Sequence, residues 1–202
     1  MITSYATLQS SIASFLHRTD MTDIIKELIN DAEIRIANEL RIKAMEASFS
    51  SAITSGSIAL PSGFLEWKYL YIDGDSTQNL IRKDPEWIYK NYPARSGSSK
   101  PVFFAREGET MIFGPYPGSA YTAKGRYYKK LDALSDSNTT NWFITNAPAL
   151  LRYATLCEAA PYMQGDARIP IWEGKYREEK VRIEATDRRE AFSGSQLSAR
   201  AG

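Results

Sequence analysis

The sequence contains few side chains that could do chemistry together. It has one histidine, His17, and one cysteine, Cys157, far apart along the chain. Most zinc sites, thiol enzymes and histidine-assisted serine hydrolases need more than this. His17 falls at the end of a predicted helix, where the helix dipole stabilises a cation. Cys157 falls on the apolar side of another predicted helix, which indicates a buried, inert thiol.

Two carboxylates at a tight turn are the next candidates. Glu107 and Glu109 flank Gly108, and paired carboxylates are the usual machinery of glycoside hydrolysis. Acidic residues in turns are commonly solvated, so a hydrolase is the weakest of the functions considered. The segment from Gly114 to Gly118 lacks the Gly-Lys-Ser/Thr ending of a phosphate-binding loop. We therefore predict no catalytic residue, no metal site and no cofactor.

Residues 124–130 mix basic and aromatic side chains, as surfaces that bind nucleic acids do. The set comprises Lys124, Arg126, Tyr127, Tyr128, Lys129 and Lys130. A strand with one solvated face is the favoured interpretation, because Lys124 and Arg126 lie on the same side of it. A DNA-binding accessory protein that uses this strand remains the alternative function.

The composition excludes some classes of protein. The chain has 202 residues, a net charge of +1 and 12% aromatic residues. The charge gives no global attraction to nucleic acid or to an anionic membrane, and no apolar run approaches membrane-spanning length. The start lacks the pattern of a secretory signal, so we expect a soluble protein made in a cytoplasm. Aromatic content with little chemistry favours a protein that binds other proteins.

Helical periodicity marks the first 46 residues. Tyr5, Leu8, Ile12 and Phe15 predict an amphipathic helix with Thr3 or Ser4 as its N-cap. Thr19 or Asp20 is expected to cap a second helix. Its apolar face reads Ile25, Leu28, Ala32, Ile36 and Leu40, and its outer face reads Lys26, Glu27, Asp31, Glu33, Arg35, Asn38 and Glu39.

The periodicity of strands follows from Ser48. Trp67, Tyr69 and Tyr71 are expected on one face of a strand, and Glu107-Gly108-Glu109 predicts a hairpin turn. Asp84 and Pro85 predict the start of a short helix. A further strand is expected over 121–131, with Tyr121, Ala123, Gly125 and Tyr127 on one face. Residues 135–140 are polar and predict a mobile loop.

Helices return near the end of the chain. Asn146 is expected to cap a helix whose apolar stripe includes Leu150, Cys157 and Pro161. A last helix is predicted over 172–192, with six acidic and six basic residues and a thin apolar stripe of Trp172, Tyr176 and Ile183. We expect i,i+4 ion pairs along it, from Glu173 to Arg177, Glu178 to Arg182 and Glu184 to Arg188.

These elements predict an α+β fold. N- and C-terminal helices, 1–46 and 146–192, form a bundle, and residues 47–145 form an inserted antiparallel β domain. Residues 193–202 are small and polar and predict an extended, flexible C-terminal arm. The last helix is too thinly apolar to be buried along its whole length by its own domain, which favours packing against another subunit.

The layout resembles the head-to-tail adaptor proteins of tailed bacteriophages, called tail tubular protein A in some short-tailed phages. The similarity rests on "YATLQSSIASFLHRTD", on "LPSGFLEWKYLYIDG" and on the closing "APALLRYATLCEAAPYMQGDARIPIWEGKYREEKVRIEATDRR". Its most telling parts are Ala-Glu-x-Arg-Ile-x-x-Glu-Leu at 32–40 and Leu-Pro-x-x-Phe-Leu at 60–65.

The resemblance implies a noncatalytic structural protein of the virion neck, made in the cytoplasm of a bacterial host. It implies a ring of twelve copies that docks under the portal protein, carries the tail tube or nozzle protein, and lets double-stranded DNA pass through its lumen. No membrane is implied. The resemblance also suggests that the end of the chain reaches the portal. The residues expected to make that contact are Arg188, Arg189, Phe192, Leu197 and Arg200.

Overall fold

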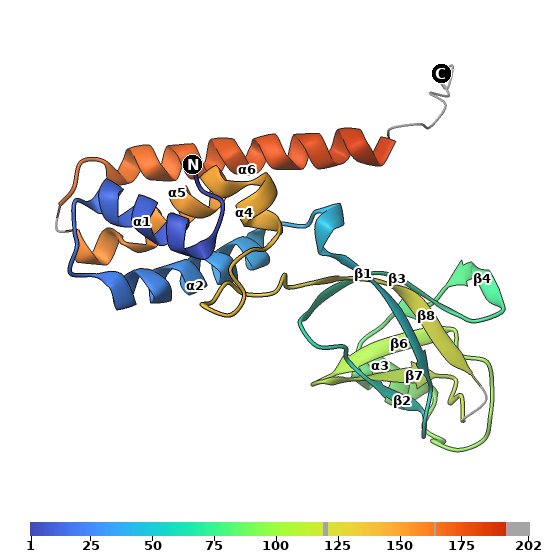
Figure 1. Cartoon of the computed structure of the whole chain (residues 1–202). Helices are drawn as coiled ribbons and strands as arrows, with labels where there is room; N and C mark the ends of the chain where they lie inside the picture. Colours follow the sequence, from blue (N-terminus) through green and yellow to red (C-terminus); the bar gives the residue numbers. More distant parts are fainter. Residues whose placement is uncertain (119–120, 164, 193–202) are drawn as a thin grey trace. The chain divides into compact units, whose positions relative to one another are not determined.

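The computed structural model describes residues 1–118, 121–163 and 165–192, without the side chains of 75–77 and 192. The chain divides into two compact units (Figure 1). One is formed by residues 1–44 with the chain from Leu131 onward, and the other by Met45–Lys130. The secondary structure confirms the expected α+β fold, with helices in the first unit and strands in the second.

The helical unit is built around one central helix. Its elements are α1 (Tyr5–Leu16), α2 (Thr22–Glu39), α4 (Trp142–Asn146), α5 (Pro148–Glu158), the 3-10 helix η2 (Ala160–Tyr162) and α6 (Ile169–Phe192). α5 packs against α1, α2, α4 and α6. Leu150, Leu151, Ala154 and Leu156 are all fully buried, so α5 is apolar on most of its circumference. A helix with apolar residues all round is stable only when other helices cover it.

The predicted apolar face of α2 is confirmed, and that of α1 is confirmed except that Leu16 is buried while Phe15 is half-buried. One of the two predicted caps is wrong. Ser4 is the N-cap of α1, in a capping box with Thr7. α2 begins after Met21, and not after Thr19 or Asp20. The carboxylate of Asp20 instead accepts hydrogen bonds from Arg18 at 2.7 Å, while Met21 is buried at the helix start.

The return to helix comes earlier than the sequence indicates. The inserted unit ends at Lys130, whereas the expected boundary was 145. α4 begins at Trp142, and its N-cap is Asn141, whose side chain accepts a hydrogen bond from the Ile144 amide at 3.2 Å; Asn146 ends this helix. In the apolar stripe of α5, Cys157 is half-buried and Pro161, beyond the helix, is exposed.

The preceding loop is attached to the helical unit. Asp136 accepts a hydrogen bond from Lys26 at 2.8 Å, and the Thr139 carbonyl accepts one from the Tyr5 amide at 2.7 Å. The carboxylate of Glu33 accepts hydrogen bonds from the Leu134 amide at 3.1 Å and from Asn141 at 2.7 Å. Glu33 therefore does not belong to the solvated face of α2.

The β unit contains two sheets. The first has the order β1 (Glu46–Ala52), β8 (Thr122–Lys129), β3 (Phe64–Ile72) and β4 (Asp75–Asn79), all antiparallel. The second has the order β2 (Ser57–Ala59), β7 (Thr110–Gly114), β6 (Phe103–Glu107) and β5 (Ile81–Arg82). The pair β5 and β6 is parallel, because α3 (Pro85–Asn91) forms the crossover between them.

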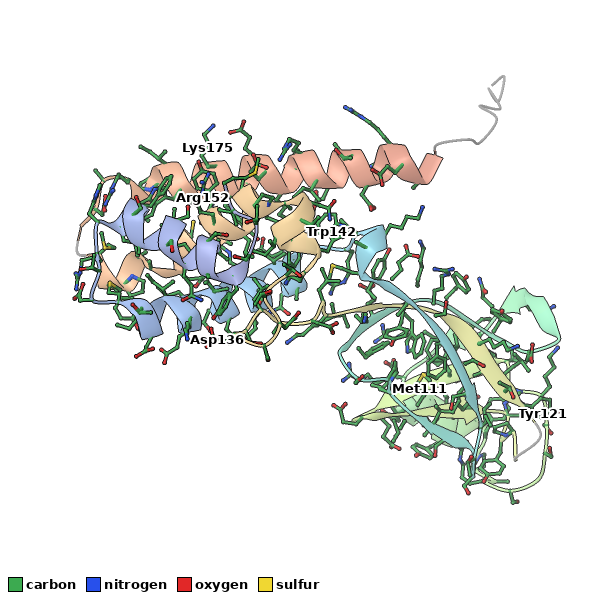
Figure 2. The ribbon with its side chains drawn as sticks, in the orientation of Figure 1. Met111, Tyr121, Asp136, Trp142, Arg152 and Lys175 are labelled. Carbon is green, nitrogen blue, oxygen red and sulfur yellow. The ribbon has the colours of Figure 1, made fainter. Side chains whose placement is uncertain are left out.

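The two sheets enclose the core of this unit. Phe49, Leu70, Phe113 and Tyr127 come from both sheets and pack in one cluster together with Met111 (Figure 2). α3 covers the second sheet through Ile88, which packs with Ala105 and Ile112. The strands thus form a sandwich with one face of the second sheet protected by a short helix.

A bulge in β3 overturns one prediction. The expected face of Trp67, Tyr69 and Tyr71 is broken, because the pairing with β8 shifts register between Trp67 and Tyr69. Trp67 packs against the core, as do Leu70 and Ile72. Tyr69 and Tyr71 lie on the opposite face and stack on each other with ring centroids 6.3 Å apart. An extra residue in one strand exchanges the faces of all residues beyond it.

The last helix begins earlier than predicted and pairs its charges differently. α6 starts at Ile169, and Trp172, Tyr176 and Ile183 are buried as expected. The pair from Glu173 to Arg177 is confirmed, at 3.3 Å. Arg182 instead bonds Glu179, and Glu178 bonds Lys175 at 2.8 Å, both at i,i+3 spacing.

Gly125 generates a prediction about the β unit. A Cβ at this position would lie 2.2 Å from the Tyr69 carbonyl oxygen and 3.0 Å from the Leu70 Cα, both backbone atoms. We expect Gly125→Ala to lower the free energy of unfolding by about 3 kcal/mol or more, because the bulged strand cannot move away. Urea titration measures this loss.

The matched control is Gly174→Ala in α6, where a Cβ meets nothing within 4 Å. Alanine there should raise stability by about 1 kcal/mol through helix propensity alone. A Gly125→Ala protein as stable as the wild type would contradict the close approach of β3 and β8.

Candidate functional site

The histidine and the cysteine lie on different helices. His17 is the exposed C-cap of α1, in the left-handed region with φ of 53°. Cys157 lies on α5, where burial and a hydrogen bond to Glu173 raise the pKa of its thiol to about 12. A thiol with so high a pKa stays protonated at neutral pH and is a poor nucleophile. Among the described residues, no hydrogen bond joins the two.

The turn carboxylates are held apart from any buried environment. Glu107 is exposed and accepts a hydrogen bond from the Tyr89 hydroxyl at 2.9 Å. Glu109 is 90% exposed and lies 3.6 Å from Arg106. A pair of catalytic carboxylates works in a cleft that holds the substrate and excludes water, whereas both of these carboxylates are exposed to solvent. Nothing in this geometry favours glycoside hydrolysis.

Two of the four basic residues at 124–130 lie beside carboxylates. Lys124 forms an ion pair with Asp73 at 2.9 Å, and Arg126 lies 3.8 Å from Glu46. Tyr127 is buried in the core of the β unit. Phosphate binding by these cations must compete with carboxylates already in place, which disfavours the DNA-binding alternative.

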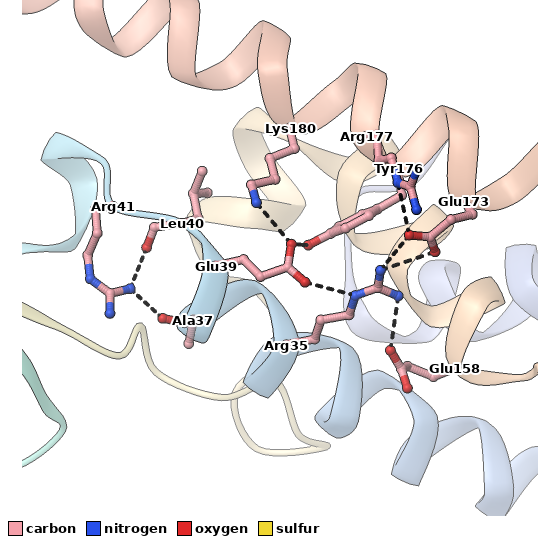
Figure 3. A network of polar contacts seen from close by, with 10 residues as sticks. All are labelled: Arg35, Ala37, Glu39, Leu40, Arg41, Glu158, Glu173, Tyr176, Arg177 and Lys180. Carbon is pink, nitrogen blue, oxygen red and sulfur yellow. Dashed lines mark hydrogen bonds and ion pairs between the residues drawn. The ribbon is translucent and has the colours of Figure 1, made fainter.

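A cluster of charged residues fastens α6 to the rest of the helical unit (Figure 3). We call it the Arg35 network; it comprises Arg35, Glu39, Glu158, Glu173, Tyr176 and Lys180. The Arg35 guanidinium donates to Glu39 at 3.2 Å, to Glu158 at 3.3 Å and to Glu173 at 2.8 Å. One side chain of α2 is thereby bonded to its own helix, to α5 and to α6.

The aromatic ring of Tyr176 completes the network. The Arg35 guanidinium carbon lies 4.4 Å from the centroid of this ring, and the Tyr176 hydroxyl donates to Glu39 at 2.9 Å. Lys180 donates to the same carboxylate at 3.0 Å. The buried ring, the cation above it and the shared carboxylate hold one face of α6 in a single orientation.

The charges in the network stabilise one another. Burial opposes ionisation of Glu39, yet hydrogen bonds from Lys180, Tyr176 and Arg35 keep its pKa below the ordinary value of 4.5. Burial likewise opposes the Arg35 charge, but bonds to Glu173 and Glu39 raise the pKa of Arg35. The pKa of Glu173 is also lowered, against burial, mainly by its bond with Arg35. All three groups are therefore ionised at neutral pH.

Arg35 and Glu39 were expected on the solvated face of α2; Glu39 is exposed there as expected, whereas Arg35 is half-buried. Arg35 is next in sequence to the buried Ile36, at the edge of the apolar stripe. Glu173 and Lys180 flank the buried Tyr176 on α6 at spacings of three and four. On both α2 and α6, charged residues border the apolar stripe in the sequence. This pattern could have indicated that the charges of the two helices pair with each other.

The C-terminal end of α6 lies beside the start of the short 3-10 helix η1 (Lys43–Met45). The Asp187 carboxylate accepts a hydrogen bond from the Lys43 amide at 2.8 Å. An open pocket of about 220 Å³ lies here, with Ile42, Trp142 and Ile183 among its lining residues. This end of α6 is thus in contact with other parts of the helical unit at least as far as Asp187.

Only part of the expected portal-facing set can be placed. Arg188 and Arg189 are exposed on the last turn of α6. The side chain of Phe192, and the whole of Leu197 and Arg200, lie outside the described residues. In the described residues, no group of three or more His, Cys, Asp or Glu side chains is arranged to hold a metal ion. None of the described helices is both long and apolar enough to span a bilayer.

The Arg35 network generates a prediction about stability and pH. We expect Arg35→Met to lower the free energy of unfolding at pH 7 by about 1–2 kcal/mol, because three partly exposed carboxylates lose their shared cation. The lowered pKa values of Glu39 and Glu173 make their stabilisation complete above the ordinary value of 4.5 and lost as pH falls through the lowered values. The difference from wild type should therefore shrink below about pH 4.

Urea titrations at pH 7 and at pH 3.5 measure both effects. The control is Arg177→Met, since Arg177 is 74% exposed and bonds only within α6; it should change stability by about 0.5 kcal/mol or less. Equal effects of the two substitutions would show that the network contributes no more than a surface ion pair.

Comparison with known proteins identifies one matching family. A model of the SU10 adaptor protein family matches residues 3–200, which is nearly the whole chain. No curated protein matches the sequence significantly. The family match confirms the resemblance to phage head-to-tail adaptors, and we conclude that the chain belongs to the SU10 adaptor protein family, a family of bacteriophage adaptor proteins.

Proposed function

We propose that this protein is a noncatalytic component of the virion neck, which forms a ring of twelve copies between the portal and the tail tube or nozzle. The observation that carries the proposal is the family match over residues 3–200. Such a ring also forms part of the conduit through which double-stranded DNA leaves the head. The protein is made in the host cytoplasm and becomes part of the particle on assembly.

The chemistry of the described side chains supports a structural role. Cys157 has a raised pKa, and Glu107 and Glu109 are solvated. Many aromatic residues of the β unit pack in or against its core, and Trp67 and Tyr127 are examples. The ion pairs of Lys124 and Arg126 suit a DNA conduit better than a DNA-binding surface, because a lumen that grips phosphates would hinder passage.

The ring is testable by native mass spectrometry. We expect the purified chain, alone or after mixing with portal protein, to give a closed oligomer of twelve subunits. Each copy then binds one neighbour through one surface and the other neighbour through a second, different surface. A DNA mobility assay at low salt is the parallel measurement. A monomer that shifts DNA, and that never assembles with portal, would favour the accessory DNA-binding function instead.

The role proposed for the end of the chain is testable by truncation. We expect deletion of residues 193–202 to leave the melting temperature nearly unchanged, because these residues are small and polar and add little to a core. The same deletion should weaken attachment to portal-bearing heads and leave filled heads without tails. Electron microscopy of particles from cells that supply the truncated protein measures this.

The control for the truncation is Arg188→Ala with Arg189→Ala in the full-length chain, which changes the exposed last turn of α6 and keeps the arm. Partial loss of attachment in this variant would assign part of the contact to α6. Normal attachment of the truncated protein would move the portal contact to the helical unit.

A further inference from the structure

The helical unit separates charge between two of its helices. In Figure 1, α6 runs along the top of this unit and α2 along its bottom, and Arg35 of α2 bonds Glu173 of α6 directly. α5 packs on both. The solvent-facing sides of α2 and α6 therefore offer two distinct surfaces, and a head-to-tail ring requires two distinct surfaces on each subunit.

The outward side of α2 is acidic. Asp23, Glu27 and Asp31 are exposed and follow one another at spacings of four residues, so they form one stripe. The basic residues of this helix are engaged elsewhere, since Lys26 bonds Asp136 and Arg35 belongs to its own network. Ile34 continues the same stripe and is 39% exposed. We call these four residues the α2 stripe.

The outward side of α6 is basic, although the helix has equal numbers of acidic and basic residues over 172–192. Four of its acids are half-buried, namely Glu173, Glu179, Glu184 and Asp187. Its exposed charges are Lys175, Arg177, Glu178, Arg182, Arg188, Arg189 and Glu190. Folding thus turns most acids toward the unit and most arginines toward solvent.

An apolar residue lies in the middle of this basic side. Val181 is 63% exposed and stands between Arg177 and Arg182 around the helix. The side chains of these arginines are 74% and 64% exposed, and each pairs within α6, with Glu173 and Glu179, so that an approaching carboxylate would share the guanidinium with its present partner. A large exposed aliphatic side chain bordered by arginines is typical of an interface centre with a polar rim. We call Arg177, Val181 and Arg182 the α6 stripe.

We propose that the α2 stripe of one copy docks on the α6 stripe of the next copy. The pairing places carboxylates against guanidinium groups and Ile34 near Val181, so charge and apolar surface are both complementary. The inference rests on the proposed ring and names the surfaces that close it. The contact is heterologous, so an open chain of copies keeps one unused stripe at each end until the ring closes.

Charge reversal tests the pairing. Glu27→Lys with Asp31→Lys, or Arg177→Glu with Arg182→Glu, should raise the concentration for half-maximal assembly by about tenfold or more, because attraction becomes repulsion. The chain that carries all four changes should assemble again, since opposite charges meet once more. Native mass spectrometry and sedimentation velocity measure the oligomers.

The control is Glu86→Lys with Glu109→Lys, at exposed positions of the β unit. It changes the net charge by the same amount as Glu27→Lys with Asp31→Lys does. It should assemble as the wild type does. Two results would overturn the proposed pairing. One is that the chain with Glu27→Lys and Asp31→Lys assembles at the same concentration as the wild type; the other is that the chain with all four changes does not assemble. A wild-type chain that never assembles, with or without portal, would instead contradict the ring itself.

Cross-linking tests the direction of the contact. With Cys157→Ser as background, Ile34→Cys with Val181→Cys should give a ladder of covalent oligomers with a short bismaleimide, because every linked chain keeps one free stripe at each end. Either cysteine alone should give no ladder. Dimers alone from the double variant would indicate a two-fold contact and overturn the heterologous pairing, as would the absence of any cross-link.

Discussion

The position of α6 depends on one half-buried cation, Arg35. Arg35 projects from α2 into a gap bordered by α5 and α6, where three carboxylates and the ring of Tyr176 surround it. A half-buried guanidinium is favourable when its donors are satisfied, and here it donates to carboxylates of three helices. The network therefore specifies one orientation of α6, a helix whose thin apolar stripe alone would constrain it weakly.

That orientation decides what the surface of the helical unit offers to a partner. With Tyr176 turned inward, Val181 faces solvent on the other side of α6, and the exposed Arg177 lies between them, beside Glu173. The same interaction that fastens the helix thus separates its acids from its arginines. A protein whose function is assembly gains two unlike surfaces in this way, without a large net charge that would make copies repel one another.

The β unit obeys a different constraint, which is the close approach of backbones. Gly125 allows β3 and β8 to meet at the bulge, where a side chain would strike the Tyr69 carbonyl. The bulge turns Trp67, Leu70 and Ile72 inward and leaves Tyr69 and Tyr71 outside. The aromatic residues that make the sequence resemble a binding surface are in large part core residues.

The sequence by itself determined the local elements and the family. The spacing of apolar residues predicted α1, α2 and the buried face of α6. The N-caps Ser4 and Asp84 indicated where two helices begin, and the turn at Gly108 indicated a hairpin. These features are local, because capping, periodicity and turn chemistry act within a few residues. Tertiary structure alone decided the partners of Arg35, the attachment of Asp136 to Lys26, and the bulge that exchanged the faces of β3. Each of these joins segments distant in the chain or follows from pairing between strands, and neither composition nor periodicity records which distant groups meet.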